Sequence, residues 1–182
     1  MPVIQASHPV FAPVISNYSP NKDTRYSAGI QCGNLLTVSV AENFKQLPRF
    51  SSGKSIFVNA AVSLNTSSIP FYAYEKMFGC IVQNNMVVDP PAVGVWGGFG
   101  YIEGMINMDS EYEVWVTWLK RVIFSPPPIS AVSCANGSIT LTTPSISGTA
   151  YLDGSAGWRE RYCFKKPKEA IDFLKCKAGI LK

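Results

Sequence analysis

The chain has 182 residues and a mass of 19.9 kDa, a size that predicts one domain with a sizeable core. Only 15% of its residues are charged and 12% are aromatic, a composition that excludes a disordered chain. No apolar run is long enough to predict a membrane-spanning helix, and nothing at the N-terminus resembles a cleaved secretory signal. The net charge of +4 falls entirely on residues 151–182, whereas residues 1–150 are neutral.

Residues 1–27 contain four prolines and show no sustained hydrophobic periodicity. This pattern predicts an extended N-terminal arm that ends in a turn around Pro20. We expect the arm to have no fold of its own and to become ordered by lying on neighbouring subunits.

Most of the following chain alternates between apolar and polar residues with a period of two, the pattern of half-buried strands. The predicted strands cover residues 36–40, 56–64, 77–82, 86–88, 93–102, 112–119, 129–135, 138–143 and 146–152. The strongest hairpin signal is Asn136-Gly137, because these residues favour the two positive-φ positions of a type I′ turn. About eight strands without interleaved helices predict an all-β fold, an antiparallel β-sandwich of the jelly-roll type.

One short helix is predicted near the C-terminus, beginning at Pro167 and ending at Gly179. Its predicted apolar face consists of Ala170, Ile171, Leu174 and Ala178. The resulting organisation is an extended arm over 1–27, a sandwich domain over 28–152 and a basic C-terminal segment with a short helix over 153–182.

The basic segment predicts a contact with an anionic partner, most simply nucleic acid bound without regard to its sequence. The candidate nucleic-acid-binding residues are Arg159, Arg161, Lys165, Lys166, Lys168, Lys175 and Lys177. The alternative is a solvated end that keeps the protein soluble.

Residues for catalysis are scarce, so we do not expect an enzyme. His8 is the single histidine and falls in the predicted arm, and the five cysteines form no Cys-x-x-Cys pair. Asp109 and Glu111 could share a structural Ca²⁺ between subunits, although a solvated loop is the favoured interpretation. No other cofactor is expected.

Trp96, Trp115 and Trp118 fall in strand-like segments. Trp115 and Trp118 are separated by an odd number of residues, so they point to opposite faces of the sheet. We therefore expect these tryptophans to lie in a subunit interface or to form an exposed stacking platform. A strand buried on both faces is the alternative.

The neutral β-rich body over 28–152, the extended arm and the size near 180 residues resemble the single jelly-roll capsid proteins of small non-enveloped icosahedral viruses. This resemblance implies a structural protein that self-assembles into a shell around the genome, found in the virion and, during assembly, in the host cytoplasm. It also implies RNA or DNA and a host receptor as partners. Many such proteins have an arginine-rich arm, whereas this arm has only Lys22 and Arg25 as bases.

Two alternative functions stay open. The first is a receptor- or glycan-binding β-sandwich, either a virion spike or a cytosolic lectin-like module, in which the tryptophans stack on sugars. The second is a membrane-active protein whose basic helix lies on anionic lipid without spanning the membrane.

Overall fold

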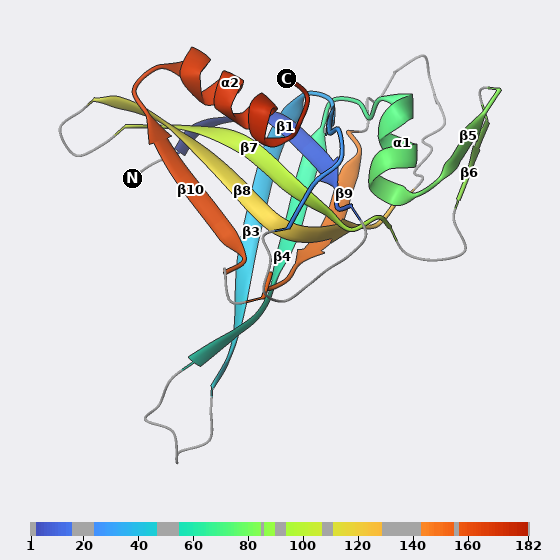
Figure 1. Cartoon of the computed structure of the whole chain (residues 1–182), viewed down its shortest axis with the longest axis horizontal. Coiled ribbons are helices and arrows are strands. Elements are labelled where there is room, and N and C mark those ends of the chain that lie inside the picture. The colour runs from blue at the N-terminus through green and yellow to red at the C-terminus, as the bar shows by residue number, and fades with distance from the viewer. Residues whose placement is uncertain are drawn as a thin grey trace, which may run out of the picture.

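The computed structural model describes residues 3–15, 24–46, 55–84, 86–89, 94–106, 111–128, 143–154 and 157–181. They form a predominantly antiparallel β structure with two short helices (Figure 1). In chain order the elements are β1 (Val3–Pro13), β2 (Ile30–Gln31), β3 (Leu35–Gln46), β4 (Ser55–Thr66), α1 (Phe71–Phe78), β5 (Ile81–Gln83), β6 (Met86–Val88), β7 (Gly97–Ile106), β8 (Tyr112–Phe124), β9 (Ser145–Ala150), β10 (Arg159–Phe164) and α2 (Pro167–Lys177). Neither helix is long and apolar enough to span a membrane.

Eight strands form one sheet in the order β2-β1-β7-β8-β9-β4-β3, with β10 paired to β8, while β5 and β6 form a separate hairpin. The long strand β8 pairs with β10 over residues 114–119 and with β9 over 122–124. The sheet curves strongly enough that β1 contacts β3, although the two strands lie far apart in the sheet order. The structure therefore has the two facing layers of an antiparallel β-sandwich, which confirms the predicted all-β fold class.

The concave side of the sheet encloses the larger apolar core. Phe11, Phe99 and Phe124 meet there edge to face, with ring centroids 5.2–6.0 Å apart. Helix α1 closes this core with Met77 and Phe78, both fully buried. These large apolar side chains hold the two layers together because covering them removes most of their surface from water.

The convex side carries a second core under α2, the predicted C-terminal helix, which the structure confirms. Leu174 and Trp118 are buried there together with Val116 and Ala170. Gly100 allows the helix to approach, because a Cβ at this position would lie 2.5 Å from the Trp118 ring and 2.6 Å from Leu174. A glycine within a strand often marks such a close approach.

A bulge in β8 lets one strand contribute to both cores. Phe99 pairs with Leu119 but Gly97 pairs with Val122, so β8 has one extra residue between these pairs. Before the bulge Trp118 faces α2, and after it Val122 faces the concave core. A bulge changes the side to which the following residues point.

The prediction of a separate N-terminal arm is wrong. Residues 3–13 form β1, which lies inside the sheet between β2 and β7, and Phe11 is fully buried. The prolines that favoured an arm are accommodated by irregularities in the strand: Pro9 follows His8 in a bulge and Pro13 is the last residue of β1. At such positions a strand does not need the N–H that proline lacks.

Two further predictions need correction. Residues 77–82 do not form one strand, because α1 ends at Phe78, Gly79 adopts a left-handed conformation (φ 72°), and β5 begins only at Ile81. The segment after 152 is not separate from the sandwich, since β10 pairs with β8. The charged residues of β10 concealed its alternation. The hairpin predicted at Asn136-Gly137 lies outside the described residues.

Candidate functional site

The end of the β3–β4 hairpin projects beyond the rest of the molecule (Figure 1). We call residues 41–46 and 55–58 the hairpin end. Every residue from 41 to 46 is exposed. Three large apolar side chains are also exposed, Phe44 by 55%, Ile56 by 48% and Val58 by 48%. Apolar groups gathered on a projecting element are typical of a surface that contacts another molecule.

Aromatic stacking holds the hairpin end to the body of the protein. Phe57 stacks on Trp158 at a centroid distance of 4.7 Å and an interplanar angle of 9°, and Phe44 lies edge to face on Phe57. Glu42 also forms an ion pair of 2.9 Å with Arg159 of β10. These contacts give the hairpin end a defined orientation relative to the sheet.

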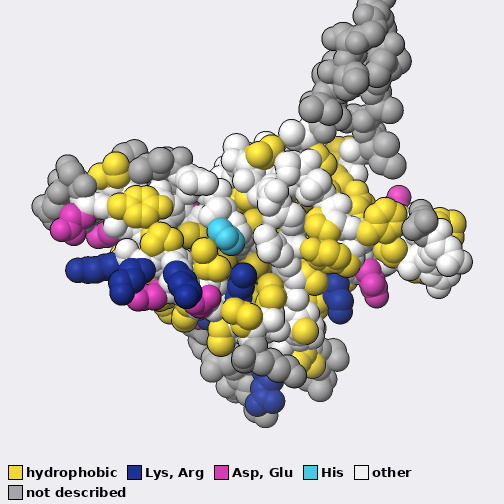
Figure 2. Space-filling model, turned by 90° about the horizontal axis from the view of Figure 1, so that it is seen from above, with side chains coloured by type: hydrophobic (Ala, Val, Ile, Leu, Met, Phe, Trp, Pro, Cys, Tyr) yellow, Lys and Arg dark blue, Asp and Glu magenta, His cyan; other side chains and the backbone are white. Residues whose placement is uncertain are grey.

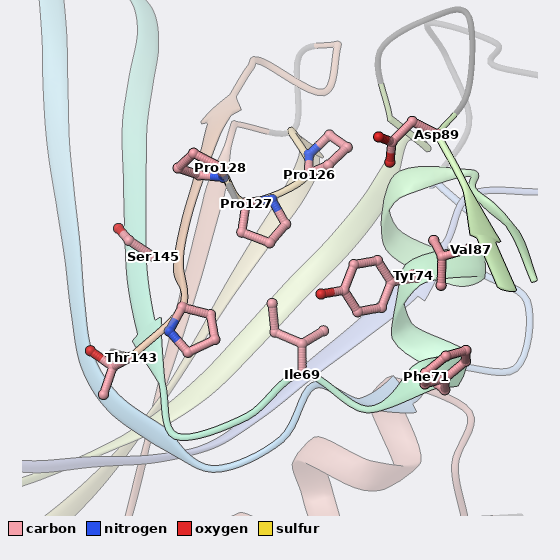
Figure 3. Close-up of a pocket in the computed structure, with 11 residues that line it drawn as sticks. Ile69, Phe71, Tyr74, Val87, Asp89, Pro126, Pro127, Pro128, Thr143 and Ser145 are labelled. Carbon is pink, nitrogen blue, oxygen red and sulfur yellow. The ribbon is translucent and has the colours of Figure 1, made fainter. Parts of the chain in front are cut away.

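A second apolar surface surrounds a pocket of about 560 Å³ beside α1, which we call the α1 pocket (Figure 3). The consecutive prolines 126–128 form one wall, and Tyr74 and Phe71 of α1 stand on the other side with Val87 of β6. Ile69 lies between the two walls. The size and the apolar lining are those of a binding pocket rather than of a packing defect.

The surroundings of the α1 pocket combine exposed apolar groups with one carboxylate. Phe71, Tyr72 and Met86 are each exposed by 50–54%. Asp89 lies at the upper side of the pocket in Figure 3, and its Oδ1 accepts a weak hydrogen bond from the Cys80 thiol at 3.9 Å. Such a surface fits an apolar group with a cation beside it.

The seven predicted nucleic-acid-binding residues differ in whether a carboxylate of the same chain pairs with them. Four of them form ion pairs with carboxylates of the same chain. These pairs are Arg159–Glu42 at 2.9 Å, Arg161–Glu103 at 3.4 Å, Lys166–Glu169 at 3.5 Å and Lys177–Glu160 at 2.5 Å. Lys165, Lys168 and Lys175 have no ion pair with another described residue. Figure 2, which looks down on the α2 side, shows basic side chains with acidic ones among them.

Lys177 belongs to a polar network under α2. Glu160 accepts hydrogen bonds from Lys177 at 2.5 Å and Tyr162 at 2.6 Å, and its other oxygen pairs with Lys120 at 2.9 Å. Burial alone would raise the pKa of Glu160, but these three donors lower it to about 2. Burial likewise opposes the charged form of Lys177, yet its bonds to Glu160 and Tyr162 raise its pKa. The network joins β8, β10 and α2, and it is therefore structural.

The three tryptophans differ in their surroundings. Trp118 is fully buried under α2, so its predicted place in a subunit interface is wrong; the helix of the same chain covers that face. Trp115 lies on the opposite face, as predicted, with the Arg161 guanidinium 4.8 Å from its ring centre. Trp96 is 37% exposed and carries the Arg121 guanidinium at 4.5 Å. In both cases a guanidinium covers one face of the ring.

The predicted calcium site stays a prediction. Asp109 lies outside the described residues, and Glu111 is exposed at the start of β8. Within the described ranges no group of three or more histidine, cysteine or carboxylate side chains is arranged to hold a metal ion.

The hairpin end and the α1 pocket were not predicted as sites from the sequence. The strand patterns at 36–40 and 56–64 gave the base of the hairpin, but they did not indicate that β3 continues through residue 46. A signal was present in Phe44, a large apolar residue between the polar residues Asn43 and Lys45. Whether such residues are covered depends on the rest of the fold.

Comparison with known proteins places this chain in no family. No family model matches the sequence, and no curated protein matches it. A solved structure described as "Crystal structure of Hcp protein" is similar over 87% of this chain and 99% of that chain, with 9% sequence identity and a TM-score of 0.40. A likeness this slight assigns neither a family nor a function.

Proposed function

We propose that the protein is a structural protein that assembles from many copies of itself, and that the hairpin end is a principal contact between copies. The observation that carries this proposal is the exposure of Phe44, Ile56 and Val58 on a projecting, anchored hairpin. The proposal keeps the capsid-like function expected from the sequence and assigns it a contact surface.

The energetic argument is the removal of apolar surface from water. Full burial of a large apolar side chain contributes about 1.5–3 kcal/mol, so covering the exposed half of all three residues contributes roughly 2–4 kcal/mol. That amount alone gives a weak contact, because association also costs translational and rotational freedom. Repeated around a closed assembly, it stabilises a particle more than any single pair of copies.

The outer edge of β3 is a second surface available to another copy. β3 is the last strand in the sheet order and, among the described residues, pairs only with β4. An open strand edge offers its N–H and C=O groups to a strand of another chain. Pairing at this edge would continue the sheet of one copy into the sheet of the next.

The glycan-binding alternative is supported less well. It requires a bare aromatic face on which a sugar ring can stack. Trp96 and Trp115 each have an arginine guanidinium over the ring, and Trp118 is buried.

Particle size tests the proposed function. We expect the purified protein to form large particles of defined size in light scattering and in negative-stain microscopy. The variant Phe44→Ser/Ile56→Ser should shift the protein toward single chains. The matched control is Leu152→Ser/Leu181→Ser, which removes two exposed apolar side chains elsewhere and should leave the particles intact. A wild-type protein that stays a single chain over a range of salt and pH would overturn the proposal.

A further inference from the structure

We infer that the α1 pocket of one copy receives the hairpin end of the next copy, so that the copies join head to tail. This inference rests on the proposed function, because it names the partner surface of the hairpin contact.

The two surfaces match in chemistry. The hairpin end presents Phe44 and Ile56 to solvent. The α1 pocket offers about 560 Å³ between Pro126–Pro128 and the aromatic rings of α1, with further exposed apolar groups around it. A pocket of this size accepts an apolar anchor such as Ile56. The proline wall is rigid, so little conformational freedom is lost when the pocket fills.

Charge at the edges of the two surfaces is also complementary. Lys45 pairs directly with Ile56 across the hairpin, so their side chains share a face. Lys45 is exposed, and Asp89 lines the α1 pocket and is exposed. Neither forms an ion pair with any other residue that the structure describes. With Ile56 in the pocket, the Lys45 ammonium would lie beside the Asp89 carboxylate. Such a pair sets the orientation of the contact more than its strength.

A hairpin end that fills the pocket must belong to another copy. Ile56 lies near one end of β4 and Thr66 ends the strand on the α1 side. Ten residues of strand separate them by about 30 Å, at ~3.3 Å per residue. The anchored hairpin end therefore cannot reach the α1 pocket of its own chain. Figure 1 shows the end of the β3–β4 hairpin and helix α1 at different extremities of the molecule.

A contact between two different surfaces has a consequence for symmetry. Each copy gives its hairpin end to one neighbour and receives the hairpin end of another. Such contacts generate closed rings or shells when the rotation between copies closes, and open filaments when it does not. Reciprocal exchange of hairpin ends about a twofold axis would give a closed dimer instead, and the size of the particles distinguishes the two arrangements.

A charge-exchange cycle tests the inference with variants of exposed residues, which should leave the fold intact. Lys45→Glu and Asp89→Lys should each weaken assembly about threefold to tenfold, measured as the protein concentration at half-assembly in light scattering. The double variant Lys45→Glu/Asp89→Lys should return to within about twofold of the wild type. The matched control pairs Lys45→Glu with Glu75→Lys, an exposed charge on α1 that does not line the pocket, and should not restore assembly.

Cross-linking between two different chains gives a second readout. In a background with Cys134→Ser, Cys163→Ser and Cys176→Ser, one preparation carries Ile56→Cys and the other Phe71→Cys. A short bis-maleimide should join chains in the mixture and should not join Ile56→Cys to Leu181→Cys. If rescue and cross-linking both fail while Phe44→Ser/Ile56→Ser still abolishes assembly, the pocket inference is overturned and the proposed function stands. A monomeric wild type would overturn both.

Discussion

The convex face under α2 and the hairpin end differ in whether the chain covers their apolar side chains. Under α2, Trp118 and Leu174 are buried by an element of the same chain, and nearby charges on Glu160 and Lys177 are paired. At the hairpin end, Phe44 and Ile56 remain about half exposed although they belong to the same sheet. The apolar side chains of the hairpin end therefore remain accessible to another molecule.

The difference lies in what each region contributes to the isolated chain. Substitutions under α2 should reduce the free energy of unfolding, because they create cavities or unpaired charges. Substitutions at the hairpin end should leave the folding of a single chain nearly unchanged and alter association. Four measurements test this division, in order of the expected change.

The largest effect is expected from Trp118→Ala. Removing the fully buried indole leaves a cavity between β8 and α2 and should lower the free energy of unfolding by about 3–5 kcal/mol. Urea denaturation followed by circular dichroism measures this change. Trp96→Ala is the matched control: its ring is 37% exposed, so the loss should be about 1 kcal/mol or less. Equal losses in the two variants would contradict the buried role of Trp118.

A smaller effect is expected from Glu160→Gln, and it depends on pH. Donors from Lys177, Tyr162 and Lys120 oppose the effect of burial and lower the folded-state pKa of Glu160 to about 2, below its ordinary value of 4.5. The carboxylate therefore contributes stability above pH 4.5, and this contribution is lost as the pH falls from 4.5 toward 2. Because its side chain is 30% exposed, solvent screening reduces the contribution to about 1–2 kcal/mol.

Denaturation midpoints measured between pH 2 and 7 test this prediction. The wild type should lose stability over this range by about 1–2 kcal/mol more than Glu160→Gln does. Glu169→Gln, which removes the carboxylate of an exposed pair with Lys166, should follow the wild type. A Glu160→Gln curve parallel to that of the wild type would show that the network does not stabilise the folded state.

The sequence predicts the middle of the sheet better than its ends. Residues 112–119 alternate and lie in β8, because a half-buried strand imposes this period directly on its residues. β1 and β10 escaped prediction for different reasons. The prolines of β1 are accommodated by a bulge and a strand end. In β10 the charged residues on one face alternate with Tyr162 and Phe164 on the other, under α2.

The exposure of the candidate site residues depends on tertiary structure more than the positions of the strands do. The alternation rule places Trp115 and Trp118 on opposite faces, but it does not say which face α2 covers. In the same way, Phe44 is as apolar as Phe99, and Phe44 is exposed because the end of the β3–β4 hairpin projects beyond the rest of the molecule (Figure 1). Exposure of this kind is decided by contacts between segments far apart in the chain.

The hairpin end should show a much smaller change in folding stability. At protein concentrations at which the chain is monomeric, Phe44→Ser/Ile56→Ser should alter the free energy of unfolding by about 0.5 kcal/mol or less, as surface substitutions usually do. At higher concentrations the wild type should gain apparent stability from assembly and the variant should not. A loss of several kcal/mol in the monomer would place the hairpin end in the core and remove its contrast with the α2 face.

The smallest change in stability, and a specific change in binding, is expected from Lys165→Gln/Lys168→Gln/Lys175→Gln. These three lysines form no ion pair within the described part of the chain, so they can contact phosphates without first losing a carboxylate partner. Three phosphate contacts would give a slope of log affinity against log salt of about −2 to −3. The triple variant should flatten this slope for a labelled single-stranded nucleic acid in fluorescence anisotropy, and its free energy of unfolding should change by about 0.5 kcal/mol or less.

Arg159→Gln/Arg161→Gln is the contrasting variant. Because Glu42 and Glu103 already pair with these arginines, it should reduce the slope little. If it reduces the slope as much as the triple variant, the two ion pairs open on binding, and these five basic residues belong to one nucleic-acid surface.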